Sequence, residues 1–334
     1  MNRLIFLLIV CSAGFAQTHR LAATAKTVVF GYFDASTPPV LRMRSGETVE
    51  IRSSMIASAE ALEAAGVDRS EIDPELRAIY REVRDRGPGP HILTGPIFIE
   101  GAEPGDVLEV EIQDIRLSVP YALNQFIPGL GTLPEDFPYT VAKIVRLDTR
   151  RMVTEIRPGV YVSLRPFFGC MGVAPPAELG RISSVPPWIH AGNLDNKELV
   201  AGTRLFIPIH VKGALFSAGD GHAAQGNGEV DLMALETALI GTFRLAVRKG
   251  PRLLWPRAET PSHFITMGFD EDLNIAAKLA TRDMIDFLVE EKKMKRDDAY
   301  MLVSVAVDLA VTQLVDGKKG IHAMLPKSVF RGSE

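Results

Sequence analysis

The stretch "TRLFIPIHVKGALFSAGDGHAAQGNGEVD", Thr203 to Asp231, joins a strongly apolar run to a polar run rich in glycine. Its first half is typical of β-strands, because aliphatic and aromatic side chains dominate it. Its second half interleaves Asp220, His222, Gln225 and Glu229 with glycines at 219, 221, 226 and 228. Asp220 and His222 are two positions apart, so an extended chain places both side chains on one face. The pattern predicts that a ligand approaches this backbone closely.

Further short runs of the sequence have the composition and the alternation of half-buried strands. The clearest is "DVLEVEIQDI", residues 106–115, in which apolar and acidic side chains alternate. Other predicted strands cover 27–33, 47–53, 95–101, 161–169 and 320–326. Between two of these, the Ala, Leu and Glu content of 56–87 predicts one or two helices inserted between strands.

The C-terminal part changes character and predicts helices. The segment 272–293 places apolar side chains on one helical stripe. That stripe consists of Leu273, Ala276, Ala277, Ala280, Met284, Phe287 and Leu288. A second helix is expected over 297–311, because Asp297 and Asp298 in a first turn favour the helix dipole. Asp308 then falls within an apolar helix, where we expect it to be buried and hydrogen-bonded.

Composition and charge narrow the class of protein. The chain has 334 residues, 46% of them apolar, which is ample for a packed core. Its 37 basic and 41 acidic residues are spread along the chain and leave a formal net charge of -4. This balance predicts neither a nucleic-acid partner nor an anionic membrane surface, and it suits a small neutral substrate.

The N-terminus is typical of a secretory signal peptide covering residues 1–16. Arg3 precedes the apolar run "LIFLLIV", and Gly14 and Ala16 occupy the -3 and -1 positions of a cut before Gln17. A membrane anchor is the alternative, but the run falls short of the roughly 20 residues that span a bilayer. Cys11 leaves a lipoprotein as a further alternative. We expect a secreted or periplasmic protein, whose one remaining cysteine, Cys170, packs as a small core residue.

A second polar cluster lies in "WIHAGNLDNKEL", Trp188 to Leu199, where His190, Asn193 and Asp195 fall within six positions. Imidazole nitrogens and carboxylate oxygens are ligands that zinc accepts, and an open coordination position leaves room for water. Spacing alone fits a solvated Asn/Gly turn nearly as well for each cluster.

The identity of the residues in these segments is more informative than their spacing. The run "HAGNLDNKELVAGTRLFIPIHVKGALFSAGDGHAAQGNGEV", residues 190–230, closely resembles the signature region of the acetamidase/formamidase family. The likeness continues in 38–51, 91–112, 266–291 and 298–327, in the same order, and so covers nearly all of the chain after the signal peptide. Blocks of this length are far more specific than one short motif.

The resemblance implies hydrolysis of a small carboxamide to a carboxylate and ammonia by a metal-associated protein, usually a homodimer. It also implies a mainly β fold: a β-sandwich with jelly-roll-like architecture plus a smaller α+β subdomain that carries the C-terminal helices. Within the unit 17–334, we expect a β-rich N-terminal part at about 25–180. The site-bearing β and C-terminal helical part is expected at about 181–330.

The family's polar positions are occupied by residues of this chain, to which the resemblance gives roles. The expected metal ligands are Asp195, Asp220, His222 and His91. The expected catalytic residues are Glu229, His190, Asn193 and Gln225. Substrate contacts are expected from Glu100 and Trp188. The chain departs from the family pattern at Asn227, where an Asp is expected, and at Gly221, where a bulkier residue is common.

These roles form one chemical hypothesis. A divalent cation, zinc with calcium as a second ion, would polarise the amide carbonyl and acidify a water. Glu229 would transfer protons, and the glycines would let backbone N–H groups face the oxyanion. Purely structural roles stay open beside these: Glu229 capping a turn, His222 bonded within its own loop, and His91 orienting the following "TGP" turn. A binding module without turnover, or a hydrolase of a larger C–N substrate, also fits the same scaffold.

Overall fold

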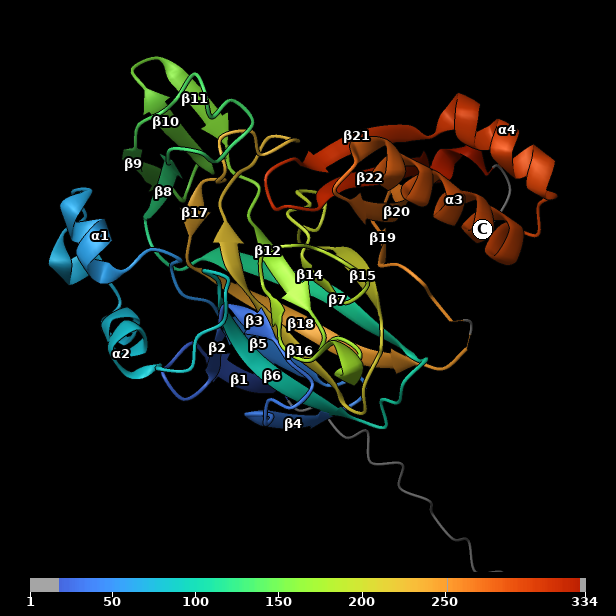
Figure 1. Ribbon diagram of the computed structural model, residues 1–334, viewed down its shortest axis with the longest axis horizontal. Helices are drawn as coiled ribbons and strands as arrows, with labels where there is room; N and C mark the ends of the chain where they lie inside the picture. Colours follow the sequence, from blue (N-terminus) through green and yellow to red (C-terminus); the bar gives the residue numbers. More distant parts are fainter. Residues whose placement is uncertain (1–17, 251, 331–334) are drawn as a thin grey trace, which may run out of the picture.

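Two large β-sheets pack face to face and form most of the molecule, as Figure 1 shows. The structure is a computed structural model and describes residues 18–250 and 252–330. The predicted signal peptide lies outside these residues. None of the described helices has both the length and the apolar character needed to cross a lipid bilayer.

The nine-stranded sheet runs from N-terminal strands at one edge to C-terminal strands at the other. Its strands, in spatial order, are β1 (Thr18–Ala22), β5 (Thr48–Arg52), β18 (Leu239–Arg248), β7 (Val107–Leu117), β15 (Thr203–Pro208), β19 (Arg257–Glu259), β20 (His263–Asp270), β22 (Lys319–Pro326) and β21 (Asp308–Gln313). The alternation predicted for β7 is confirmed from Val110 to Gln113, since Val110 and Ile112 are fully buried while Gln113 is exposed. Glu109 departs from it, because it is buried and forms ion pairs with Arg204 and Arg248.

The eleven-stranded sheet carries the polar segments. Its main path is β11 (Val160–Ser163), β10 (Val153–Arg157), β9 (Val141–Asp148), β8 (Tyr121–Phe126), β17 (Glu236–Thr237), β16 (Ala214–His222), β12 (Phe167–Gly172) and β14 (Ala191–Asn193). Off this path, β6 (Ile92–Glu100) pairs with β16, β2 (Val28–Phe30) and β4 (Leu41–Arg44). A separate pair joins β3 (Tyr32–Phe33) to β13 (Ile182–Ser183).

The main core lies between the two sheets. Ile51 and Val110 from the nine-stranded sheet meet Phe168, Phe216 and neighbours from the eleven-stranded sheet in one buried cluster. This face-to-face packing of two mainly antiparallel sheets confirms the predicted sandwich. Burial of these apolar side chains is the main stabilising contribution, at roughly 25 cal/mol per Å² removed from water.

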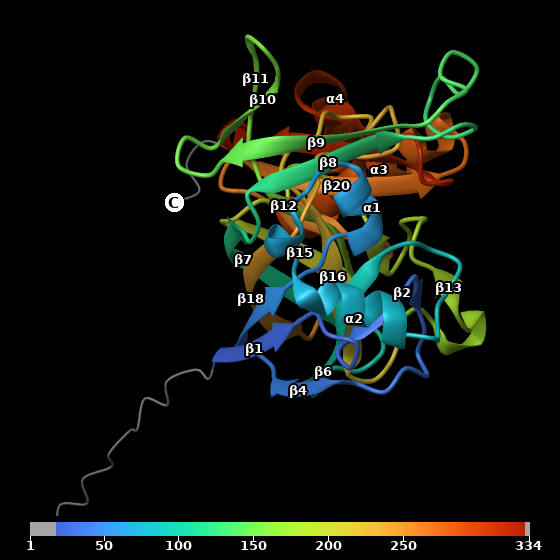
Figure 2. The same ribbon diagram turned by 90° about the vertical axis from the view of Figure 1, so that its left-hand side faces the viewer.

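Helices cover the sandwich in two places, as Figure 2 shows. The first pair, α1 (Ala59–Ala64) and α2 (Pro74–Glu82), confirms the predicted insertion and packs Leu62 and Ile79 over β6 and β8. The second pair, α3 (Leu273–Lys292) and α4 (Arg296–Ala306), packs on β20 and β22. Short 3₁₀ turns lie at Arg69–Glu71, Ala177–Leu179 and Lys327–Val329.

The predicted apolar stripe of α3 is confirmed. Ala276, Ala280, Met284 and Leu288 are buried against the sheet, and the Asp272 side chain caps the helix by accepting from the backbone N–H of Asn274. The prediction for the second helix is wrong in its last third, because α4 ends at Ala306 and residues 308–313 form β21. β21 pairs with β22, and this pairing outweighs the weak helix preference of a valine-rich run.

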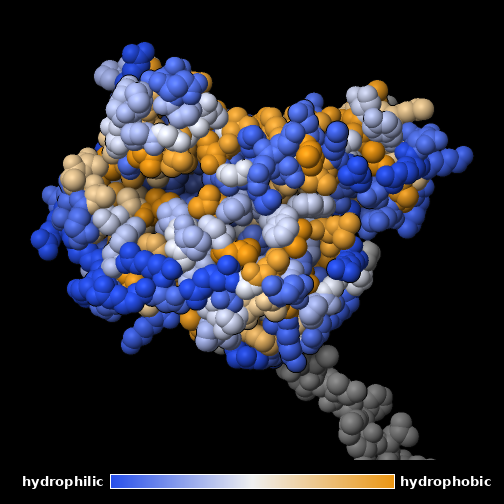
Figure 3. Space-filling view, viewed as in Figure 1, coloured by the Kyte–Doolittle hydropathy of each residue, from blue (hydrophilic) through white to orange (hydrophobic). Residues whose placement is uncertain are grey.

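Asp308 also differs from the prediction, since it is exposed at the start of β21 rather than buried in a helix. The expected α+β subdomain is an extension of the sandwich, because β19 to β22 continue the nine-stranded sheet. The helices α3 and α4 form one lobe on one side of the molecule, and the strands β9 to β11 form a second lobe on the same side. Figure 3 shows apolar residues gathered between these lobes.

Candidate metal and catalytic site

Asp220 and His222 lie at the end of β16, whose nine residues are all buried. β12 flanks this end on one side and β17 on the other, where His222 pairs with Glu236. The Oδ2 atom of Asp220 is 3.2 Å from Nε2 of His222. The prediction that these two side chains meet is therefore confirmed.

Asp195 reaches the same place from the loop after β14. Its backbone N–H donates to the carbonyl of Gly169 on β12 at 3.1 Å, which holds the loop against the strand. Gly169 itself lies directly beneath the polar atoms. A Cβ there would sit 2.5 Å from Asp195 Oδ1, 2.5 Å from Asp220 Oδ2 and 2.7 Å from His222 Cε1. Only a residue without a side chain leaves room for these groups to converge.

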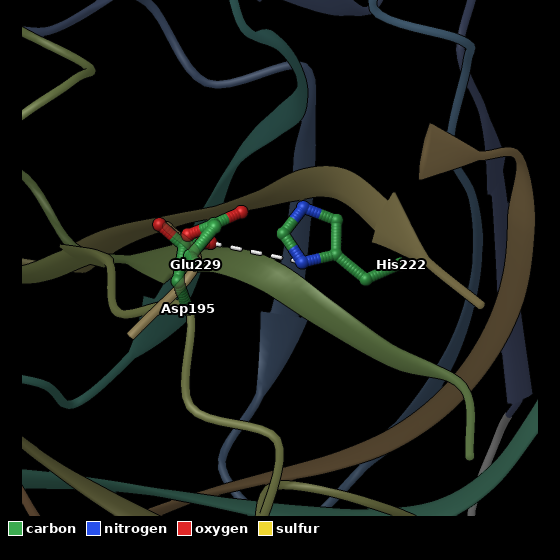
Figure 4. Close-up of side chains that lie close together, drawn as sticks. All are labelled: Asp195, His222 and Glu229. Atoms are coloured by element: carbon green, nitrogen blue, oxygen red, sulfur yellow. Dashed lines mark ion pairs between the residues drawn. The ribbon is translucent and has the colours of Figure 1, made fainter. Parts of the chain in front are cut away.

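Glu229 completes the group from the loop that follows β16. Figure 4 shows the carboxyl groups of Asp195 and Glu229 together on one side of the His222 ring. Asp195 Oδ1 is 3.8 Å from His222 Nδ1. The β21 region holds this loop: Gly228 N–H donates to Thr312 O, and Leu314 N–H donates to Gly228 O, both at 3.0 Å. The C-terminal part of the chain therefore positions Glu229.

Two further acids join the cluster, and neither was predicted from the sequence. Glu236 on β17 places Oε1 at 3.3 Å from His222 Nε2. Asp316, from the loop between β21 and β22, lies beside Asp195, whose charge raises the pKa of the Asp316 carboxyl group. An acid within the apolar run "MALETALI" was a usable signal for Glu236. Asp316 gave none, because "DG" is an ordinary turn pair.

Three of the acids have unusual backbone conformations. The φ angles of Asp195, Asp220 and Glu229 are 44°, 58° and 46°, in the left-handed region that non-glycine residues seldom adopt. Such conformations cost on the order of 1–3 kcal/mol each and persist only where the surroundings determine them. Their concentration in one cluster is typical of a functional site.

The cluster holds more negative charge than it can neutralise by itself. Burial raises the pKa of Glu229 and of Asp316 well above the usual range, and the nearby Asp195 raises both further. Burial likewise raises the pKa of Glu236 to about 7. Within the described residues, Asp195 Oδ1, Glu229 Oε2 and Asp316 Oδ2 have no hydrogen-bond partner. Buried orphan oxygens of this kind fit a site that receives a cation or a proton.

The imidazole of His222 partly compensates the negative charge of these acids. Burial lowers its pKa, but Glu236 and Asp220 raise it more, so the net pKa lies well above the ordinary value. The reverse holds for Asp220, where burial raises the pKa and His222 and His91 lower it below the usual range. A divalent cation bound among these acids would act in the same direction as the imidazolium.

Polar residues around the cluster orient it. Asn193 donates its amide N–H to Asp195 Oδ2 at 2.6 Å, and Gln225 donates to the backbone carbonyl of Asp195 at 2.7 Å. His91 forms a 2.8 Å hydrogen bond between its Nδ1 and Ser184 Oγ, while its Nε2 is 3.9 Å from Asp220 Oδ2. The structure therefore brings Asn193, Gln225 and His91 to the cluster.

His190, Trp188 and Glu100 stay outside the cluster. His190 packs edge-on against Phe33 at 4.9 Å between ring centroids, and burial lowers its pKa to about 3. Its neutral ring makes no hydrogen bond to the described residues, which argues against a proton-transfer role. Trp188 is half-buried and lies beside Lys318.

Glu100 is exposed at the far end of β6. Leu93, near the other end, pairs with Gly219 beside the site. The seven residue steps from Leu93 to Glu100 separate Glu100 from the site by about 23 Å at about 3.3 Å per residue. The assignment of Glu100 to substrate binding is therefore wrong.

Two glycines of the polar run, Gly219 and Gly221, serve a different purpose from the one predicted. A Cβ at Gly219 would lie 2.3 Å from Ile92 O, and one at Gly221 would lie 2.6 Å from Thr237 O. These two glycines let neighbouring strands approach β16. The N–H of Gly228 is occupied by Thr312 O, so it does not face an oxyanion.

A cavity of about 540 Å³ opens beside the acids. Gln225 and Glu229 line it together with Asn124, Arg165 and Met233. Its walls thus combine apolar surface with a few polar groups, as small-molecule sites do. The cavity provides a route by which a substrate reaches Glu229.

Comparisons with known proteins agree with this architecture. A family model described as the Acetamidase/Formamidase family matches residues 86–182 and 180–332. The formamidase of Methylophilus methylotrophus is 27% identical over 314 residues, an alignment that covers 72% of this chain and 77% of that protein.

Solved structures resemble the whole fold. A crystal structure of an acetamidase from Bacillus halodurans matches with a TM-score of 0.79 and 30% identity, over 93% of this chain and 98% of that one. An acetamidase from Yersinia enterocolitica matches with a TM-score of 0.81 and 27% identity, over 96% of this chain and 95% of that one. The likeness therefore spans both sheets and the C-terminal helices.

Proposed function

Because the chain belongs to the acetamidase/formamidase family, we propose that it is a metal-dependent amidohydrolase that converts a small linear carboxamide to a carboxylate and ammonia. The family membership supports the amidase activity. The metal dependence rests on the geometry of the site.

The proposed metal binding rests on one observation. Five buried acids converge around His222, and three of their oxygens have no hydrogen-bond partner among the described residues. Two sets of three residues each bring their ligand atoms within 4.8 Å of one another. These sets are Asp195, His222 and Glu229, and Asp220, His222 and Glu236. Imidazole and carboxylate groups together suit zinc, whereas an all-oxygen set would favour calcium. The donor set therefore fits the expected zinc, with carboxylates to spare for a second ion.

When bound, such a cation polarises an amide carbonyl and lowers the pKa of a water from about 15.7 to about 7. Side chains of the protein perform the proton transfer and the positioning. Glu229 lines the cavity, and its raised pKa suits a group that takes a proton from the attacking water and returns it to the departing ammonia. Asn193 holds Asp195 in place through the 2.6 Å hydrogen bond. Burial keeps bulk water away from these groups.

The test is release of ammonia from formamide and acetamide by purified protein, with its metal content measured on the same sample. We expect stoichiometric metal, loss of activity after treatment with a chelator, and recovery when zinc is returned. Full activity in protein that contains no metal would refute the metal dependence. Metal binding without turnover of any amide would instead support a binding module.

A larger amide is a second candidate substrate. The cavity of about 540 Å³ is far larger than formamide requires, and sites of this size hold drug-sized ligands. A series of amides of increasing acyl length separates the two. If kcat/KM rises strongly with acyl length, the larger substrate is favoured.

Export and self-association complete the proposal. Export rests on the N-terminal pattern of Arg3, the apolar run and Ala16, which lie outside the described residues. A homodimer is supported by the exposed apolar side chains of Tyr300, Met301 and Val305 on α4, which are 63%, 66% and 81% exposed. Sedimentation of the wild type and of Val305→Lys tests it, because a charge on this face should shift a dimer toward monomer.

A further inference from the structure

His222 belongs to both ligand sets, but with a different ring nitrogen in each. Its Nδ1 is 3.8 Å from Asp195 Oδ1, on the side of Glu229. Its Nε2 is 3.2 Å from Asp220 Oδ2 and 3.3 Å from Glu236 Oε1. A neutral imidazole offers a lone pair on one nitrogen and a proton on the other. The tautomer of His222 therefore decides which side can hold the cation.

The orientation of the Gln225 amide follows from its two contacts. One end is 2.7 Å from the backbone carbonyl oxygen of Asp195, and the other is 2.9 Å from His222 Nδ1. A carbonyl oxygen can only accept a hydrogen bond, so the amide nitrogen must face Asp195. The amide oxygen then faces His222 and must itself accept. Nδ1 of His222 consequently keeps its proton, and Nε2 is the nitrogen that can present a lone pair to a cation.

We propose that Gln225 is a positioning residue that fixes this tautomer of His222 and so directs the cation to Nε2, Asp220 and Glu236. This inference rests on the proposed metal dependence. Asp195 and Glu229 are left on the Nδ1 side as carboxyl groups that handle protons. A metal-binding histidine that donates its other N–H to an oxygen acceptor is the usual arrangement, because it fixes the ring and makes the ligand more basic.

The distances on the Nε2 side support the choice. Ligands bound tetrahedrally at about 2.0–2.1 Å are separated from one another by about 3.3–3.4 Å. The separations of Nε2 from Asp220 and Glu236, 3.2 and 3.3 Å, match this edge. They exceed the about 2.7–2.9 Å of a charge-assisted hydrogen bond. The 3.8 Å on the Nδ1 side is too long for the same tetrahedron.

His91 also faces this side. Its Nε2 lies 3.9 Å from the Asp220 oxygen that also faces His222. Its Nδ1 is tied to Ser184 Oγ at 2.8 Å, so the ring presents Nε2 to the acids. The 3.9 Å separation is longer than the tetrahedral edge, so His91 stands next to the set of His222, Asp220 and Glu236, in which Glu236 takes the place that sequence reasoning gave to Asp195.

The first test compares Glu236→Gln with Glu229→Gln in full-length protein, using zinc affinity measured by competition with a chromogenic chelator. We expect Glu236→Gln to lose most of its zinc affinity and Glu229→Gln to stay close to the wild type, with both folded by circular dichroism. The reverse order would place the cation on the Nδ1 side and overturn the inference. If the wild type binds no zinc, the metal dependence fails as well, and the wild-type measurement alone reveals it.

The second test addresses Gln225 itself. Gln225→Met removes the acceptor at similar size, and we expect zinc affinity to fall by about 10 to 100-fold, as for other changes to the partner of a ligating histidine. Gln225→Glu keeps an oxygen facing Nδ1 but loses the N–H that donates to the Asp195 carbonyl, so it should restore part of the affinity.

Nitrogen NMR provides a signature that a merely structural role would not change. In the wild type, with or without zinc, the His222 Nδ1 should show a directly bonded proton, assigned by its loss in His222→Gln. An unprotonated Nδ1 in the wild type, or unchanged affinity in a folded Gln225→Met protein, would refute the role of Gln225.

Discussion

Replacing Gly169 by alanine should destroy the site while leaving the fold. The added Cβ would lie 2.5 Å from Asp195 Oδ1 and from Asp220 Oδ2, each 0.9 Å inside the 3.4 Å at which ordinary contact begins. It would lie 2.7 Å from His222 Cε1, which is 0.7 Å too close. A metal site tolerates displacements of only about 0.2 Å in its ligand distances. The required shifts exceed this tolerance several-fold, so we expect zinc affinity to fall by at least about 10²-fold and turnover to fall with it.

The fold should survive this change. Gly169 has no left-handed φ, so alanine fits the backbone there, and overpacking of one methyl typically costs about 1–3 kcal/mol. Zinc affinity, ammonia release and thermal unfolding should be measured on one preparation.

Gly226→Ala is the matched control. It lies in the loop that carries Glu229, it has no left-handed φ, and a Cβ there meets nothing within 4 Å. It should retain zinc, activity and stability. A folded Gly169→Ala protein with wild-type metal content would refute the convergence of ligands over this glycine.

Three other predictions concern different parts of the molecule. Glu229→Gln should retain zinc while turnover falls by at least about 10²-fold, and the acidic limb of its pH–rate profile should move; near-normal turnover would remove Glu229 from proton transfer. Hydrogen bonds from His19 and Arg44 lower the pKa of Glu47 to about 2, so this carboxylate stabilises the fold above about pH 4.5 and loses that contribution as the pH falls toward 2. Glu47→Gln should therefore lower the free energy of unfolding at pH 7 by about 1–3 kcal/mol, and the difference from wild type, followed by urea titration, should vanish near pH 2. If export occurs, N-terminal sequencing of protein from the native cell should find Gln17 at the start, whereas an intact Met1 on the mature protein would contradict it.

The sequence predicted the elements whose causes are local. The stripe of α3 repeats every three to four residues, and the alternation in β7 repeats every two, so each pattern reports which face is buried without knowledge of the partner. The same logic placed Asp220 and His222 on one face of a strand. It failed at 307–311, where pairing of β21 with β22 decides between two conformations that a valine-rich run can adopt.

The resemblance of the signature segments predicted the family and four members of the cluster: Asp195, Asp220, His222 and Glu229. It did not separate residues that reach the site from polar neighbours in the same segments. Glu100 lies on β6, which pairs with β16, the strand that ends at Asp220 and His222. The length of β6 nevertheless separates Glu100 from those two residues.

Only the tertiary structure identified Glu236 and Asp316 as members of the site. Glu236 arrives because β17 pairs with β16, and Asp316 arrives because the hairpin of β21 and β22 closes over the loop of Glu229. Neither neighbourhood leaves a periodic trace in the chain, since contacts between distant segments depend on strand order and on the way the sheets pack. The tautomer of His222 is a further step removed. It follows from the distances of the Gln225 amide to the His222 ring and to the Asp195 carbonyl. The spacing of residues in the sequence does not predict these distances.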